Sequence, residues 1–251
     1  MLDLLKAPVL SLQEFFGLAG RAIRNVFRPP YYLDDIFLQM DIIGFGSLPI
    51  VVLTGFFTGA VMALQMSKAL AMYGAVGKTG EVVSMSIVRE LGPVLTALMV
   101  TGRNSSGMAS ELGSMRVTEQ IDAMRALGTD PSRKLVTPRL IATAVVLPLL
   151  TVISDFIGLF GGFVIAYAML HMTPAQYWNS AWQTLEYADI AQGLTKPFCF
   201  AFVIALVGCY LGMQTTGGTQ GVGRSTTRAV VVASVWIFVL DFFLSQIFVN
   251  V

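Results

Sequence analysis

Two residues of opposite charge, Arg89 and Glu90, lie side by side in the segment 83–100 (VSMSIVRELGPVLTALMV), which is otherwise fit for hydrocarbon. A charged side chain at the centre of a membrane helix costs about 2.5 to 3.5 kcal/mol, so such residues normally face a bundle interior or a water-filled cavity. Adjacent helical residues point about 100° apart, so this pair cannot simply neutralise itself on one face. At least one of the two therefore needs another partner.

A local irregularity of the helix is expected directly after this pair. Pro93 has no backbone N–H, and its ring collides with the carbonyl four residues earlier, which is that of Arg89. Gly92 precedes the proline. The sequence therefore predicts a kink at which the helix can open toward a cavity.

Three more charged residues, Asp155, Lys196 and Asp241, also lie within apolar segments. In one interpretation the charges form buried ion pairs that fix helix packing, for instance Arg89 with Asp155 or Asp241. In the other they form a polar patch that holds an amphiphilic substrate by its head group, with Arg89 and Lys196 as anchors for phosphate. We favour the substrate interpretation for Arg89, Glu90 and Lys196. We favour the packing interpretation for Asp155 and Asp241.

The elements that carry these residues are those of an integral membrane protein. Of the 251 residues, 55% are hydrophobic and only 12% are charged, and the mean hydropathy is +0.72, which is unlike an ordinary soluble domain. A helix needs about 20 apolar residues to cross a bilayer. Five apolar segments are near or above this length: 42–66, 82–100, 140–170, 190–213 and 229–249. The sequence therefore predicts an all-α polytopic fold with five transmembrane helices in a domain at 31–251.

Residues 1–30 show a different pattern. Apolar residues recur every three or four positions and basic residues lie off that stripe, which is typical of an amphipathic helix in the membrane interface. The stripe consists of Leu2, Leu5, Val9, Leu12, Phe16, Ala19, Ile23 and Val26, and the basic residues are Lys6, Arg21, Arg24 and Arg28. A helix packed against other protein is the alternative interpretation.

The distribution of lysine and arginine predicts the orientation, because cytoplasmic loops are enriched in these residues. Twelve of the sixteen lie in the N-terminal region and in the connections at 101–139 and 214–228. The opposite side has only Lys68 and Lys78. We therefore expect a cytoplasmic N-terminus and an outer C-terminus.

The connection at 107–127 has helical spacing of apolar residues, such as Met108, Leu112 and Met115, with charges on its other faces. This predicts an amphipathic cytoplasmic helix. From periodicity alone it could be a solvated surface helix or a docking element.

Several chemistries have no support in the sequence. A net charge of +1 without a basic face gives no sign of nucleic-acid binding. The segment GTQGVGRS at 218–225 resembles a phosphate-binding loop, but it joins two membrane segments and has Arg224 in place of lysine, so we interpret its glycines as a tight turn. Cys199 and Cys209 do not have the spacing of a metal pair, and hydrolase motifs are absent. We expect no catalytic residue, metal or cofactor in this chain.

Four blocks of the sequence resemble one known family. RELGPVLTALMVTGR, SELGSMRVTEQIDAM, LGTDPSRKLVTPR and PLLTVISDFIGLFGG occur in this order from Arg89 to Gly162. They closely resemble the MlaE/YrbE permeases, the membrane subunits of ABC transporters that move phospholipids or other lipids with Mce-type substrate-binding proteins. The resemblance implies a homodimer of five-span permeases, cytoplasmic ATPase subunits that bind ATP, an outer ring of Mce-domain proteins and often a STAS-domain partner.

The resemblance also implies roles for single residues. Arg89 and Glu90 match a pair at the family's lipid pocket, and Lys196 matches a lysine of the same site. Tyr73 matches a tyrosine near the end of the first span. Pro197, directly after Lys196, is a departure that changes the local geometry. The segment at 107–127 also matches the family's coupling helix, which contacts the ATPase. The resemblance therefore implies that four residues contact the ATPase: Glu111, Met115, Glu119 and Asp122.

These observations predict a permease subunit of a phospholipid ABC transporter in the bacterial inner membrane. The alternative from another class is an ion-coupled secondary transporter in which Glu90, Asp155 or Asp241 carries protons. A third interpretation is a scaffold whose charges only hold the helices together.

Overall fold

The computed structural model describes the backbone of residues 2–249 and the side chains of residues 10–248, and every regular element in that range is a helix. Five helical segments are long and apolar enough to cross a membrane: Leu33–Ala71, Val76–Val117, Ser132–Leu170, Tyr187–Met213 and Gly218–Phe248. The predicted all-α polytopic fold with five spans is therefore confirmed. The predicted interfacial stripe at Leu2, Leu5 and Val9 lies outside the described side chains.

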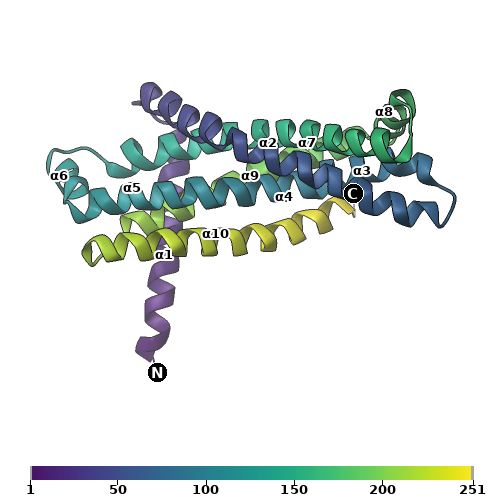
Figure 1. Cartoon of the computed structure of the whole chain (residues 1–251). Coiled ribbons are helices and arrows are strands. Elements are labelled where there is room, and N and C mark those ends of the chain that lie inside the picture. Colours follow the sequence, from purple (N-terminus) through teal and green to yellow (C-terminus); the bar gives the residue numbers. More distant parts are fainter. Residues whose placement is uncertain (1, 250–251) are drawn as a thin grey trace. The chain divides into compact units, whose positions relative to one another are not determined.

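Figure 1 shows the helices in chain order. They are α1 (Leu2–Val26), α2 (Leu33–Ala71), η1 (Val76–Lys78), α3 (Thr79–Ser86), η2 (Ile87–Leu91), α4 (Gly92–Val100), η3 (Thr101–Ser105), α5 (Ser106–Val117), α6 (Gln120–Ala126), η4 (Ser132–Val136), α7 (Thr137–Leu170), α8 (Pro174–Gln183), α9 (Tyr187–Met213) and α10 (Gly218–Val249). The spans begin earlier than hydropathy alone predicted. In α2, for example, Asp34 and Asp35 occupy the first turn, where carboxylates favour the positive end of the helix dipole.

Two local predictions are wrong. The segment 218–225 is not a turn, because it forms the first turns of α10, and the chain reverses at 214–217 instead. Gly217 and Gly218 have positive φ angles of 86° and 65° there, which glycine adopts without steric strain. The connection at 107–127 is not one helix, because α5 and α6 are separated at Thr118 and Glu119.

Three short π-helical segments occur in the second and third spans, two within the second span and one at the start of the third. They are η2, η3 and η4, and the first of them contains both Arg89 and Glu90. A π segment changes the direction of the side chains that follow it, and such segments are frequent at functional sites. The irregularity that Pro93 predicted is thus present, as a π segment directly before the proline.

The chain forms two compact units. Unit 1 consists of 1–43, 101–145 and 201–236, and unit 2 consists of 44–100, 146–200 and 237–251. Helices α2, α7, α9 and α10 each contribute residues to both units.

The core of unit 1 joins α5 to α9 and α10. Buried Ala109 packs with Leu211 and Ala233 there, and Phe15 of α1 covers the cluster. The small residues of these helices allow close packing in a membrane protein. This arrangement fixes the base of the predicted coupling segment.

The core of unit 2 depends on close contact between α2 and α7. A Cβ atom at Gly59 would collide with the carbonyl of Gly158, and one at Gly161 would collide with the carbonyl of Phe56. Glycine at these positions therefore lets the two backbones touch.

Helix α8 packs beside α3 in unit 2 (Figure 1). A capping box at Thr173 and Gln176 starts the helix. Tyr177 is buried, and its hydroxyl donates to the carbonyl of Leu159 at 3.0 Å. Burial raises the pKa of Tyr177 above its ordinary value, so the hydroxyl keeps its proton.

Candidate functional site

A network of charged residues in unit 2 joins η2 to α9 and α10. Lys196 is completely buried and forms ion pairs with Glu90 and, at 3.0 Å, with Asp241. Its ammonium also donates to the hydroxyl of Ser245 at 2.7 Å. An unpaired ammonium would be very unfavourable at this depth, so two carboxylates and a hydroxyl stabilise it.

Arg89 has a partner that the sequence reasoning missed. Its Nε lies 2.6 Å from Oδ1 of Asp189 in the first turn of α9, and not beside Asp155 or Asp241, the partners that the packing interpretation gave as examples. Asp189 also accepts a hydrogen bond from the backbone N–H of Glu186 at 2.9 Å, as a helix-capping carboxylate does. An aspartate at a helix-capping position before an apolar segment was the feature of the sequence from which Asp189 could have been found.

Gln192, one turn after Asp189, completes the contact between α9 and η2. Its side-chain amide donates to Oε1 of Glu90 at 3.1 Å and lies 3.4 Å from the carbonyl oxygen of Arg89. Pro93 cannot donate a hydrogen bond to that carbonyl, which is the helical partner of position 93. Gln192 therefore compensates for a donor that the proline removes.

The exposure of these side chains separates them into two groups. The Arg89 side chain is 36% exposed and that of Glu90 is 42% exposed, whereas Lys196 is fully covered. Arg89 and Glu90 can therefore contact another molecule. Lys196, which the sequence predicts to be a phosphate anchor, is buried in this structure and forms ion pairs with Glu90 and Asp241, so its role as an anchor stays a prediction.

The two carboxylates assigned to packing have different surroundings. Asp241 lies in the ion pair with Lys196. Asp155 forms no ion pair with a described residue, and its buried Oδ1 has no hydrogen-bond partner in the described part of the chain. A Cβ atom at Gly92 would collide with the carboxyl group of Asp155, so position 92 has room only for glycine.

Tyr73 is not part of this network. It lies in the turn after α2, is 84% exposed and forms no side-chain hydrogen bond with a described residue. The structure therefore does not bring it together with Arg89, Glu90 and Lys196.

An apolar groove of about 380 Å³ begins at the residue after Glu90. It is lined by Leu91 of η2 and by one side of α2. The residues from α2 are Phe57, Thr58, Val61, Met62 and Gln65. Unit 2 thus contains both the charged network and an apolar groove, and Glu90 and Leu91, one from each, are neighbours in the chain.

The residues expected to contact an ATPase lie in unit 1 and differ in accessibility. Glu111 is turned toward Arg139, whose Nη2 lies 2.7 Å from its Oε2. Asp122 is held by Arg116 at 2.5 Å and Arg125 at 3.0 Å. These two carboxylates therefore maintain the shape of the segment.

The other two predicted coupling residues, Glu119 and Met115, form no ion pair with a described residue. Glu119 is exposed at the bend between α5 and α6, with a φ of 60°. Met115 is half-buried on α5. An ATPase could reach Glu119 directly.

The fold and the network define a polytopic α-helical protein that keeps ionisable residues inside its spans, which is typical of membrane transport proteins. The family model described as Permease MlaE matches residues 36–247. The chain therefore belongs to the MlaE permease family, as the sequence resemblance predicted.

Relatives from several organisms agree with this assignment. A probable ABC transporter permease protein of Rickettsia conorii is 43% identical over 241 residues, which is 96% of this chain and 93% of that protein. A probable ABC transporter permease protein of Synechocystis is 41% identical, over 92% of this chain and 88% of that protein. The chloroplastic protein trigalactosyldiacylglycerol 1 of Arabidopsis thaliana is 35% identical, over 92% and 66%. The chain is thus a permease subunit of an ABC transporter.

Proposed function

We propose that this permease moves phospholipids between the bacterial inner membrane and a periplasmic Mce-domain carrier, driven by ATP hydrolysis in a separate subunit. The observation that carries the proposal is that Arg89 and Glu90 are partly exposed and directly precede Leu91, which lines the apolar groove. A phospholipid requires both surfaces, because it has a charged head group and apolar chains.

Arg89 is the group best suited to a lipid phosphate. Asp189 contacts its Nε at 2.6 Å, and its two Nη nitrogens donate no hydrogen bond to a described residue. A guanidinium binds phosphate oxygens through paired N–H groups, and the Nη groups can do so while Asp189 fixes the side chain. Lys196 acts as a positioning residue through Glu90.

Coupling to the ATPase is proposed to occur at the bend between α5 and α6. Glu119 and Met115 would contact the ATPase, while the internal ion pairs of Glu111 and Asp122 keep the bend rigid. Glu111 of α5 contacts Arg139, which belongs to α7, so a movement of the bend would be transmitted to α7 through this ion pair.

The assembly proposed here contains two copies of this chain with ATPase subunits, and a STAS-domain protein in addition in some systems. The Mce-domain ring would lie on the outer side. The basic connections support a cytoplasmic N-terminus and a periplasmic C-terminus, because basic loops stay in the cytoplasm.

The test is ATP-dependent transfer of labelled phospholipid between vesicles that contain the whole complex and the purified Mce carrier. We expect Arg89→Gln and Glu90→Gln to lower the transfer rate by roughly tenfold, the effect of losing about 1.4 kcal/mol of charge-assisted binding. Glu81→Gln is the matched control, because the side chain of Glu81 takes part only in an ion pair with Lys78 at 3.7 Å among the described residues. Unchanged transfer in both site variants would overturn the proposal, as would purification of the chain without an ATPase.

A further inference from the structure

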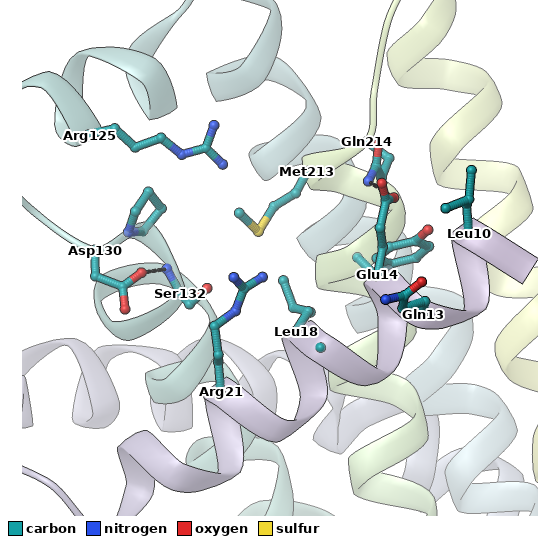
Figure 2. A pocket seen from close by; sticks show the side chains of 13 residues that line it. Leu10, Gln13, Glu14, Leu18, Arg21, Arg125, Asp130, Ser132, Met213 and Gln214 are labelled. Carbon is teal, nitrogen blue, oxygen red and sulfur yellow. Dashed lines mark hydrogen bonds between the residues drawn. The ribbon is translucent and has the colours of Figure 1, made fainter.

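Unit 1 contains a cavity that shares no residue with the ionic network. Its volume is about 760 Å³. It is lined by one side of α1, by the chain from the end of α6 to the start of η4, and by the last turn of α9 (Figure 2). Both apolar and charged side chains line it, with Leu10 and Met213 among the former.

Two arginines supply the positive charge of the cavity. Figure 2 shows the side chains of Arg21 and Arg125 pointing into the space between α1 and the segment that carries Asp130. Arg21 forms no ion pair within the described part of the chain. Arg125 contacts Asp122 through Nη1 at 3.0 Å, and Asp122 is already paired with Arg116. Both guanidinium groups therefore keep N–H donors for a ligand.

Two carboxylates balance this charge. Glu14 accepts a hydrogen bond from the side chain of Gln214 at 2.8 Å through Oε2, and Asp130 accepts one from the backbone N–H of Ser132 at 2.9 Å through Oδ1. Glu14 also lies within hydrogen-bonding reach of the side chain of Tyr210, which lines the cavity as well. The second oxygen of Asp130 accepts no hydrogen bond from a described residue. The two carboxylates would repel a purely anionic ligand, and the two arginines would repel a purely cationic one. A ligand that carries both charges therefore fits this cavity best.

Helix α1, which forms one wall of the cavity, is amphipathic, as helices at a membrane surface are. The cavity residues of α1 recur at helical spacing from Leu10 to Arg21. The exposed apolar residues Leu12, Phe16 and Ile23 lie on another side of the same helix. A helix of this kind lies at the level of the lipid head groups with its apolar side toward the acyl chains. With α1 at that level, the cavity would be open to lipid head groups.

We propose that this cavity binds the head group of a zwitterionic aminophospholipid, that is, one with a phosphodiester and a primary ammonium. Arg21 and Arg125 contact the phosphate, and Glu14 and Asp130 accept hydrogen bonds from the ammonium. The bound lipid links α1 to the end of α6 and to α9. This lipid is a resident ligand, so the proposal does not depend on which substrate the permease moves.

The test is photo-crosslinking from inside the cavity. A diazirine amino acid replaces Gly17, which lines the cavity and where an added Cβ meets nothing within 4 Å. The full-length chain is reconstituted in vesicles that contain phosphatidylethanolamine, phosphatidylglycerol or phosphatidylcholine as the test lipid in a neutral background. Mass spectrometry of the α1 peptide measures the lipid adduct, so lipid at Arg89 or Glu90 does not contribute to the signal.

We expect the adduct to be roughly tenfold more abundant with phosphatidylethanolamine than with the other two lipids, because each of them lacks the primary ammonium. Arg21→Gln and Arg125→Gln should each lower the adduct by a similar factor. Arg28→Gln is the control, since Arg28 is exposed near the end of α1 and does not line the cavity. Equal adducts from all three lipids, no adduct, or adducts unaffected by the cavity variants would overturn the proposal. Unaltered thermal unfolding of each variant excludes misfolding as the cause.

Discussion

The guanidinium of Arg139 lies directly against the carboxylate of Glu111, with Nη2 at 2.7 Å from Oε2. Arg139 is almost fully buried on α7 and also donates to the carbonyl of Leu135 at 2.6 Å, whereas Glu111 belongs to α5 and is mostly exposed. The contact therefore connects the predicted coupling segment to a membrane-spanning helix through a buried positive charge.

Replacing Glu111 by Gln should destabilise the fold, because the buried Arg139 loses its counter-charge. We expect the free energy of unfolding to fall by about 1 to 2 kcal/mol, measured by denaturant titration of the full chain in detergent. Glu119→Gln is the matched control and should change it by less than about 0.5 kcal/mol, as is usual for an exposed site. Equal losses in the two variants would show that the Arg139 contact contributes nothing.

Glu119 occupies a left-handed backbone conformation at the bend, with a φ of 60°. Glycine adopts this conformation freely, so Glu119→Gly should raise the free energy of unfolding by about 0.5 to 1 kcal/mol. If Glu119 contacts the ATPase as proposed, the same variant should bind that subunit more weakly in a pull-down of the purified complex. A gain in stability with undiminished ATPase binding would remove Glu119 from the proposed contact.

Lys196 should matter more for stability than for substrate binding. Lys196→Met leaves Glu90 and Asp241 close together without a cation, so we expect a loss of about 3 kcal/mol in unfolding free energy. The triple variant Lys196→Met, Glu90→Gln, Asp241→Asn removes the whole charge group and should recover most of that loss. No recovery would mean that the ammonium has a role beyond neutralising these two carboxylates.

The sequence was sufficient to predict the spans, because their apolar lengths far exceed what soluble helices require. It also drew attention to Arg89, Glu90 and Lys196 as charges inside apolar segments, and the structure places these three residues in one network. Their role as a substrate site stays a prediction. It could not predict their partners. Asp189 lies at the start of α9, 100 residues away from Arg89, and nothing local in the sequence indicates which element faces which.

The coupling segment shows the same limit. Periodicity identified helical character at 107–127, and Ile121, Leu112 and Met108 are indeed buried. The break at Glu119 was not predictable, because glutamate has no preference for a positive φ and the conformation results from the fold around it. Likewise, the inward direction of Glu111 depends on Arg139, which belongs to another helix.

Tyr177 should make stability depend on pH in alkaline solution. Burial raises the pKa of its hydroxyl above the ordinary tyrosine value of about 10. The folded state therefore holds this proton more tightly than the unfolded state, and this stabilisation is complete below pH 10 and is lost as pH rises toward the folded pKa. Tyr177→Phe should reduce the loss of stability above pH 10. It should also cost about 1 kcal/mol at neutral pH, because Leu159 loses its hydrogen-bond donor.

The contact between α2 and α7 can be tested with a pair of glycine variants that should have opposite effects. Gly59→Ala places a Cβ against the carbonyl of Gly158, so the helices must separate, and we expect the free energy of unfolding to fall by about 1 to 3 kcal/mol. Gly17→Ala, also within a helix, meets nothing within 4 Å and should raise stability by up to about 1 kcal/mol through helix propensity. Thermal unfolding of both variants in the same detergent decides the matter. A stabilising effect of Gly59→Ala would show that the two backbones are not in contact in the membrane.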